Sequence, residues 1–326
     1  MKIKMLLIAV LSLTFCCQLT AQPLIKKLRS PVIFRGDSIT AYRDPAILFH
    51  KGIYHLFFTL VETEADGLVF SYTAKSVSRN LRKWSSPVKL TPRDQNLNFC
   101  SPGNVIRFGD EWILCLQTYP RPGLRNTDPV RYGDQSARVF IMRSNDLETW
   151  SQPEILMVKG SGVSVSDMGR MIDPYLLEDK TEKGKYWCFY KQRGVSMSFS
   201  YDLMNWTFNG FTDAGENVTV LIENDEYLMF HSPSNGIGMK RSPDLKNWTD
   251  TGILITLGQD QWEWARGRIT AGTVVNLKDE KRIAGYLMFF HGSGPLKENQ
   301  GDFDRNASIG IAWSRDLSEW EWPGKK

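Results

Sequence analysis

Short hydrophobic stretches separated by polar turns recur along the chain and form two interleaved series. Members of one series open with an aromatic residue and lie at positions 54–58, 112–116, 186–190, 227–231 and 286–290. Ahead of each lies a member of the other series, at positions 45–49, 104–108, 174–177, 218–222 and 273–277. Their short length and alternation are typical of strands rather than helices. The pattern therefore predicts a pair of strands repeated five times.

A turn motif, Ser-x-Asp/Asn-Leu-x-x-Trp, follows each pair of strands. Its copies occupy residues 78–84, 144–150, 200–206, 242–248 and 314–320. The serine and the aspartate or asparagine can bond to nearby backbone groups, while the leucine and tryptophan pack the turn onto a sheet. The motif is therefore structural, and its value lies in how often it recurs. One aromatic-bearing turn per group of short strands is typical of a β-propeller, in which each group is one blade.

Each repeat has room for four strands. Two strands, a third before the turn and a fourth after the tryptophan make one antiparallel blade. Five such blades predict an all-β, five-bladed β-propeller that forms a single domain over residues 22–326. The fifth blade has no room for its fourth strand, because the sequence stops shortly after Trp320. Residues 30–34 carry the fourth-strand pattern, so we expect this N-terminal strand to complete the last blade and close the ring.

Composition narrows the classes of partner. The chain has 326 residues, of which 42% are hydrophobic, enough for a well-buried core. With 40 Lys and Arg against 36 Asp and Glu, the charge is close to balanced, and no basic block stands out. We therefore expect no nucleic-acid partner. We also expect no membrane span, because no later segment is long and apolar enough, and we expect a monomer.

The first residues resemble an export signal. A basic start, an apolar run over residues 5–15 and a small-residue site ending at Ala21 come in the required order. The run is too short to span a bilayer. We therefore expect residues 1–21 to be a cleaved signal peptide and the product to be periplasmic or secreted. A lipoprotein anchor at Cys16 is the less favoured alternative, since the bulky Phe15 precedes it.

Acidic residues open the first strand of three blades. In a propeller these strands line the central axis, so their openings converge at one mouth of the ring. Asp44 and Asp173 each stand before a proline, and Glu216 opens the fourth blade. Acids beside a packed axis are unfavourable unless they are solvated or paired. One Asp-Pro alone would favour a turn cap, but three acids at corresponding places favour a functional site.

These residues and the Asp-Leu-x-x-Trp turns resemble the five-bladed propeller glycosidases, closest in pattern to glycoside hydrolase family 43. The resemblance covers roughly residues 40–322 and implies hydrolysis of a glycosidic bond with inversion. It implies Asp44 as general base, Glu216 as general acid, Asp173 as the residue that orients and tunes the acid, and Arg268 as a substrate-binding residue. The family's acid usually begins a Glu-Gly-Pro run, whereas Asn217 follows Glu216 here. Glu263 is therefore held in reserve as the acid.

The remaining candidates are single residues. Arg43, Asn104, Trp264 and His291 are candidates for substrate binding, because they lie near predicted strand starts or ends. For His231 and His291 a structural role is the favoured interpretation, with a bound calcium or a substrate contact as the alternative. The cysteines show no zinc spacing, so we predict no metal site and no required cofactor.

Three functions remain open at this stage, all with a carbohydrate partner. The favoured one is a glycosidase, such as an α-L-arabinofuranosidase or β-xylosidase-like exo-enzyme. The second is a glycoside phosphorylase, which needs a cationic pocket for phosphate, for which Arg43, Arg266 and Arg268 are available. The third is a carbohydrate-binding propeller without catalysis, in which the axis acids would be dispensable. The sequence leaves open the sugar, the linkage, and endo or exo action.

Overall fold

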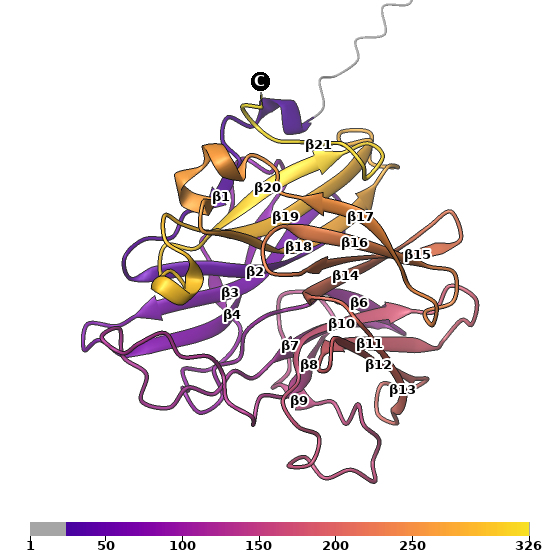
Figure 1. Cartoon of the computed structure of the whole chain (residues 1–326). Coiled ribbons are helices and arrows are strands. Elements are labelled where there is room, and N and C mark those ends of the chain that lie inside the picture. The colour runs from indigo at the N-terminus through magenta and orange to yellow at the C-terminus, as the bar shows by residue number, and fades with distance from the viewer. Residues whose placement is uncertain (1–23, 326) are drawn as a thin grey trace, which may run out of the picture.

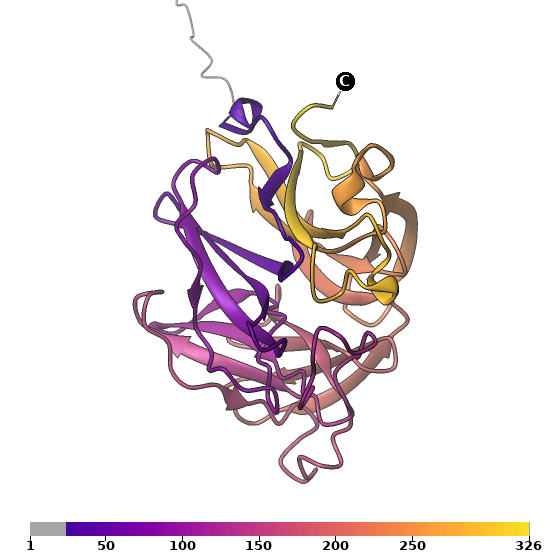
Figure 2. The same cartoon turned by 90° about the vertical axis from the view of Figure 1, so that its left-hand side faces the viewer.

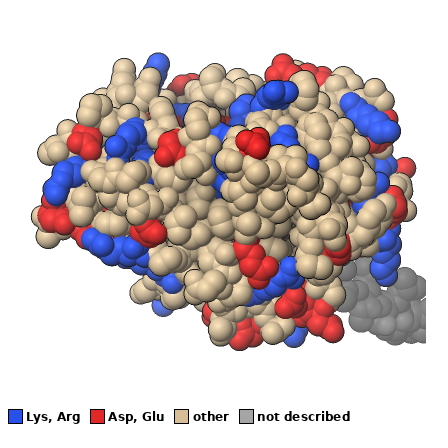
Figure 3. All heavy atoms as spheres, turned by 90° about the horizontal axis from the view of Figure 1, so that it is seen from below, with Lys and Arg blue, Asp and Glu red and all other residues tan. Residues whose placement is uncertain are grey.

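Five antiparallel sheets of short strands make up the computed structural model, which describes residues 24–325. Residues 1–21, the predicted signal peptide, lie outside the described part. Within residues 24–325, no helix is long and apolar enough to cross a membrane. On the face shown in Figure 3, basic and acidic side chains are interspersed. The prediction of an all-β, five-bladed propeller with four-stranded blades is confirmed.

The first two blades are consecutive in sequence (Figure 1). Blade one consists of β2 (Thr40–His50), β3 (Ile53–Thr63), β4 (Val69–Ser78) and β5 (Val88–Lys89). Blade two consists of β6 (Val105–Phe108), β7 (Glu111–Gln117), β8 (Val139–Ser144) and β9 (Glu154–Ile155). In each of these two blades the fourth strand has only 2 residues.

Blades three and four repeat this arrangement with longer fourth strands. Blade three consists of β10 (Ile172–Glu178), β11 (Tyr186–Lys191), β12 (Val195–Ser200) and β13 (Thr207–Thr212). Blade four consists of β14 (Glu216–Glu223), β15 (Glu226–Ser232), β16 (Ile237–Ser242) and β17 (Thr249–Ile255). Of the aromatic residues at the start of the second strands, Tyr54, Tyr186, Tyr227 and Tyr286 are buried and Trp112 is partly buried, so the second strands pack into the core between blades.

The fifth blade joins the two ends of the chain. It consists of β18 (Arg268–Leu277), β19 (Gly285–Ser293), β20 (Ser308–Ser314) and β1 (Val32–Phe34). The N-terminal β1 pairs with one half of β20, and β21 (Trp320–Glu321) pairs with the other half. Figure 2 shows the indigo β1 beside the yellow C-terminal strands. The predicted closure of the ring by residues 30–34 is therefore confirmed.

Four short 3-10 helices lie in the connections. They are η1 (Leu24–Lys27), η2 (Gln259–Gln261), η3 (Glu263–Ala265) and η4 (Glu298–Gln300). The first packs Ile25 against the core cluster between blades one and five. The last two flank the fifth blade, and η4 supplies a residue of the cavity described below.

The turn motif has nearly the same hydrogen bonds in every blade. In blade three the Asp202 carboxylate accepts from the backbone N–H groups of Met204 and Asn205, and the Trp206 indole donates to the Leu203 carbonyl. The motif leucine adopts a left-handed backbone conformation in all five copies, with φ between 58 and 70°. The motif is thus a folded turn whose polar side chains satisfy its own backbone, as expected for a structural element.

Candidate active site

One residue near the start of each innermost strand has a left-handed backbone conformation. We call these the opening residues: Asp44, Ser101, Asp173, Asn217 and Ala271, with φ between 46 and 53°. Non-glycine residues rarely adopt this conformation, which is unfavourable unless the surroundings enforce it. In four blades the ladder to the second strand shifts register at this point, which is the mark of a β-bulge.

A second ring of residues faces the opening residues from the ends of the second strands. We call these the facing residues: Thr59, Gln117, Lys191, Ser232 and His291. Four of them accept a hydrogen bond from the backbone N–H of the opening residue in the next blade. The pairs are Thr59 with Ser101, Gln117 with Asp173, Ser232 with Ala271, and His291 with Asp44. The network ties blade one to blade two, two to three, four to five, and five back to one.

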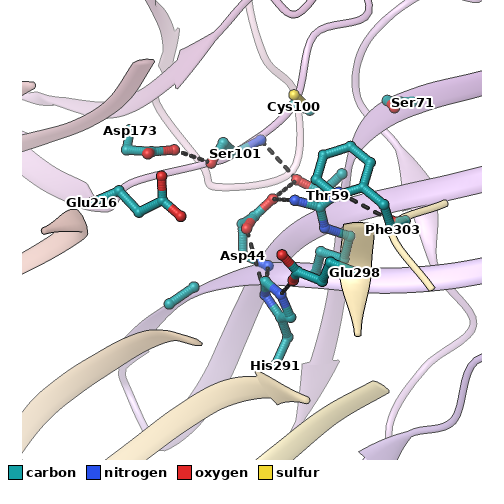
Figure 4. Close-up of polar contacts among 12 residues, drawn as sticks. Asp44, Thr59, Ser71, Cys100, Ser101, Asp173, Glu216, His291, Glu298 and Phe303 are labelled. Atoms are coloured by element: carbon teal, nitrogen blue, oxygen red, sulfur yellow. Dashed lines mark hydrogen bonds and ion pairs between the residues drawn. The ribbon is translucent and has the colours of Figure 1, made fainter. Parts of the chain in front are cut away.

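A cavity of about 570 Å³ lies where these rings meet. Asp44, Asp173 and Glu216 all line it, so the structure brings the three predicted acids from three blades to one cavity. Figure 4 shows their carboxylates turned toward a common space. Such a concave site with a few convergent polar groups is the usual form of a small-molecule binding site.

Asp44 is held by donors on two sides. The Thr59 hydroxyl donates to its Oδ2 at 2.8 Å, and the Arg43 guanidinium lies 3.9 Å from the same oxygen. His291 Nδ1 accepts from the Asp44 backbone N–H at 3.2 Å, so the proton of this imidazole belongs on Nε2. The ring Nε2 lies 2.9 Å from Glu298. The carboxylate is therefore fixed in place, with its remaining lone pairs available to the cavity.

Asp173 is the acid of the cavity whose pKa is raised. Ser101 Oγ donates to its Oδ1 at 2.9 Å (Figure 4). Burial, reinforced by the negative charges of Glu216 and Asp44, raises the pKa of Asp173 to about 7. Loss of water and nearby like charges both disfavour the ionised form. The Asp173 carboxyl group therefore keeps a proton up to a pH close to neutral.

Arg268 joins two acids of the cavity. Its guanidinium donates to Glu216 at 2.7 Å and to Glu298 at 2.6 Å. Burial acts to raise the pKa of Glu298, but the hydrogen bond from His291 and the charges of Arg43 and Arg268 hold it well below its usual range. Glu298 is thus a buried anion that orients both Arg268 and His291.

Glu216 lies in the cavity but not at the position equivalent to the other two acids. The opening residue of blade four is Asn217, and Glu216 precedes it, in the place that Arg43 and Ile172 take in blades one and three. The assumed equivalence of Glu216 with Asp44 and Asp173 was therefore wrong by one residue. The β-bulge at this point places consecutive side chains of the strand start on the cavity wall, so both Glu216 and Asn217 line it.

The other candidates divide into two groups. Arg43, Arg268 and His291 line the cavity with the acids. Asn104 and Trp264 do not. The Asn104 amide bonds to the backbone of Leu176 at 2.7 and 2.9 Å and so links blades two and three.

Three residues on or next to η3 lie outside the cavity wall. Trp264 is buried and stacks against Phe290 with ring centroids 5.9 Å apart, which is core packing. Glu263, the reserve acid, is exposed on η3. Arg266, considered for a phosphate pocket, is also exposed and does not line the cavity.

Several cavity residues were not found from the sequence. The facing residues Gln117 and Lys191 have a signal, since each is the polar residue that ends a hydrophobic second strand, and Thr59 is the first polar residue after the hydrophobic stretch of β3. Glu298 has none, because it belongs to a connection that has no counterpart in the other blades. Within residues 24–325, no group of three or more His, Cys, Asp or Glu is arranged to hold a metal ion.

The same fold occurs in solved glycoside hydrolases. The chain is similar to an exo-1,5-α-L-arabinanase from a bovine ruminal metagenomic library, with a TM-score of 0.56 and 13% identity over 87% of this chain and 97% of that one. It is similar to the catalytic domain of a family 62 α-L-arabinofuranosidase from Coprinopsis cinerea (TM-score 0.58, 13% identity, 87% and 98% covered). A glycosyl hydrolase from Bacteroides ovatus gives a TM-score of 0.62 with 12% identity, over 91% of each chain.

No protein-family model matches the sequence, and no curated protein matches it. At identities this low, the likeness to solved structures concerns the fold. The chain therefore has the five-bladed propeller found in glycoside hydrolase families 43 and 62, as the sequence motifs indicated.

Proposed function

We propose that the protein is a glycoside hydrolase that cleaves a glycosidic bond with inversion. The observation that supports this most directly is the convergence of Asp44, Asp173 and Glu216, from three blades, on one cavity of about 570 Å³. Inverting hydrolysis needs an acid and a base on opposite sides of the sugar, roughly 6.5–9.5 Å apart. Carboxylates on different blades of one ring suit that separation better than neighbours on one strand.

Each acid has a proposed role that its surroundings support. Asp44, held by Thr59 and Arg43, acts as the base that activates water. Glu216 protonates the leaving oxygen. Asp173, whose pKa is raised to about 7 by burial and by the charges of Glu216 and Asp44, orients and tunes the acid and itself keeps a proton near neutral pH. The substrate follows from the same proposal: an arabinofuranoside, a xyloside or a related exo-cleaved glycoside.

The reaction is tested on aryl-glycosides and natural oligosaccharides, with and without phosphate. We expect release of free sugar, and NMR of the first-formed product should show the anomer opposite to that of the substrate. A retained anomer contradicts water attack guided by Asp44. A sugar 1-phosphate formed only with phosphate identifies a phosphorylase, and binding without turnover identifies a carbohydrate-binding propeller.

The acid is tested by Glu216→Gln, with Glu263→Gln as the matched control. Glu216→Gln should slow natural substrates more than aryl-glycosides, whose leaving groups need little protonation. Glu263 lies outside the cavity on η3, so Glu263→Gln should behave like the unaltered protein. If Glu263→Gln slows natural substrates and Glu216→Gln does not, Glu263 is the general acid.

Export is part of the proposal and rests on the sequence of residues 1–21 alone. The mature protein should begin at Gln22 and be found in the periplasm or medium. N-terminal sequencing and mass spectrometry check this. Retention of Met1, or lipid on Cys16, contradicts it.

A further inference from the structure

The cavity holds more positive charge than its own acids neutralise. Five cationic side chains line it: Arg43, Arg121, Arg170, Lys191 and Arg268. Three of them form ion pairs: Arg43 with Asp44, Arg121 with Asp304, and Arg268 with Glu216 and Glu298. Within the described residues 24–325, Arg170 and Lys191 form no ion pair. A cation in a partly closed cavity is more favourable with a counter-charge beside it. Arg170 and Lys191 are therefore suited to bind an anion that is not part of the protein.

Lys191 is the exception in the ring of facing residues. The other four accept a hydrogen bond from the next blade, but an ammonium group has no lone pair and can only donate. Its Nζ donates to the Ala214 carbonyl at 3.1 Å, which leaves N–H donors for a ligand. A neutral acceptor would serve the fold at this place, as Gln117 and Ser232 do in other blades.

Arg170 is anchored in a way that also leaves donors free. Its Nε donates to the Gly133 carbonyl at 3.2 Å, and its guanidinium carbon lies 5.7 Å from the centroid of the Tyr119 ring. These contacts hold the plane of the guanidinium at the cavity wall. The terminal amino groups, which form no hydrogen bond within the described residues, can bind two oxygens of one anionic group side by side.

Both cations lie on the side of the cavity formed by Asp173 and Glu216. Arg170 precedes β10 and its charge acts on Asp173, while Lys191 is paired in the ladder with Ile172. From these positions we infer that Arg170 and Lys191 bind an anionic substituent, a carboxylate or sulfate, carried by the sugar substrate. This inference rests on the proposed function and narrows its substrate class to acidic saccharides such as uronides, in place of the neutral arabinofuranosides and xylosides.

Inorganic phosphate is the other source of such an anion, and position argues against it. A phosphate that replaced water as nucleophile would approach from the side of the base, Asp44, where Arg43 is already paired. Arg170 and Lys191 are instead associated with Asp173 and with the strand start that carries the proposed acid. An anion held there belongs to the substrate rather than to the attacking group.

Binding measurements test the inference without relying on turnover. Methyl glycosides of the common hexuronates and of a sulfated hexose are compared with their neutral parent sugars by calorimetry, at low and high salt. We expect at least about 10-fold tighter binding of an acidic sugar than of its parent, as for one or two charge-assisted hydrogen bonds. Added salt should reduce this preference.

Two substitutions in the cavity and one outside it test whether Lys191 and Arg170 cause the preference for acidic sugars. Lys191→Gln and Arg170→Gln should each reduce the acidic-to-neutral preference by about 10-fold. Arg193→Gln is the matched control, because Arg193 is exposed two residues from Lys191 and does not line the cavity, so the preference should persist. Thermal melting confirms that each variant is folded.

The outcomes separate this inference from the proposed function. Equal binding of acidic and neutral sugars, no binding of any acidic sugar, or a preference that Lys191→Gln and Arg170→Gln leave intact overturns the inference. Phosphate binding that depends on Lys191, without any preference among sugars, also overturns it. Selective binding of acidic sugars without hydrolysis of any glycoside upholds the anion site and overturns the proposed function.

Discussion

The turns at the edge of the propeller and the strand starts at its axis repeat with the same fivefold period but use it differently. Every turn has the same residue types at its serine, leucine and tryptophan positions, and the same left-handed leucine. At the axis, the five opening residues share one backbone conformation, with φ between 46 and 53°, yet all but the two aspartates differ in type. The backbone repeats in both regions, but the side chains repeat only in the turns.

The difference follows from what each region must satisfy. A turn has to bond to its own backbone and pack on its own sheet, and one set of residues does this in every blade. Four of the five opening residues line one shared cavity, so their side chains are fixed by neighbours across the ring. Asp44 faces Thr59 and His291, whereas Ala271 carries no polar side chain. Diversity on a repeated backbone therefore marks the part of the propeller that carries chemistry.

The largest expected effect comes from replacing Asp44 at the axis, which is compared with replacing a turn aspartate, Asp202. Asp44→Asn should lower kcat by about 10²–10⁴, the usual worth of a general base, and leave the melting temperature nearly unchanged. Asp202→Asn is the matched control, because an asparagine, Asn80, already fills this turn position in blade one with the same backbone bonds. Its activity should stay within about twofold. Steady-state kinetics with thermal melting measure both, and a near-normal Asp44→Asn enzyme would end the assignment.

The facing residues offer a second test. Thr59→Val keeps the side-chain shape but removes the hydroxyl that donates to Asp44 and accepts from the Ser101 N–H. Leaving this buried N–H without an acceptor should lower the free energy of unfolding by about 1–3 kcal/mol. As Thr59 is a positioning residue, kcat should fall about 10-fold with little change in KM. Urea unfolding and kinetics measure these, and loss of stability with unchanged kcat would show that Thr59 serves the fold alone.

The sequence predicted the turns and the fold correctly, but it predicted the residues at the axis only in part. The fold could be predicted because the turns repeat their residues: five motifs gave five blades, and the pattern at residues 30–34 gave the closing strand. At the axis, the Asp-Pro pairs located Asp44 and Asp173. The β-bulge that makes Asn217 the opening residue of blade four has no sequence signature, so Glu216 was assigned one position out of phase. Glu298 could not be found at all, because its place depends on contacts across the ring.

A third prediction concerns Asp173 and stability. Its pKa is raised to about 7, above the value of about 3.9 expected in the unfolded chain. Between these values the folded state keeps a proton that the unfolded state has lost, so stability should fall as pH rises from 4 to 7. Asp173→Asn removes this effect and keeps an oxygen that can accept from Ser101.

The Asp173→Asn variant should therefore melt at a higher temperature than the unaltered protein at pH 7 and above, and at nearly the same temperature at pH 4. Its activity should fall, and the pH profile should lose the limb that Asp173 contributes. Melting curves and kinetics across this range measure both. A variant less stable than the unaltered protein at pH 8 would contradict the burial of an unfavourable charge.

The smallest effect should come from the aspartates of the turns, with the opposite sign. Backbone N–H groups of Asn247 and Lys246 hold the pKa of Asp244 down at about 2, and Asp316 is held in the same way. The stability that such a group contributes is present above the unfolded pKa of about 3.9 and is lost as pH falls toward 2.

Asp244→Asn keeps the acceptor oxygen but has no charge and cannot titrate. It should therefore be slightly less stable than the unaltered protein at pH 7 and about equally stable at pH 2, with a weaker dependence of stability on pH between 4 and 2. Urea unfolding at steps across this range measures the slope, and Asn80 in blade one is the natural precedent for a folded turn with asparagine. A pH dependence identical to that of the unaltered protein would mean that the Asp244 carboxylate adds nothing as a charge. The turn would then make no pH-dependent contribution to stability, and only the axis would respond to acid.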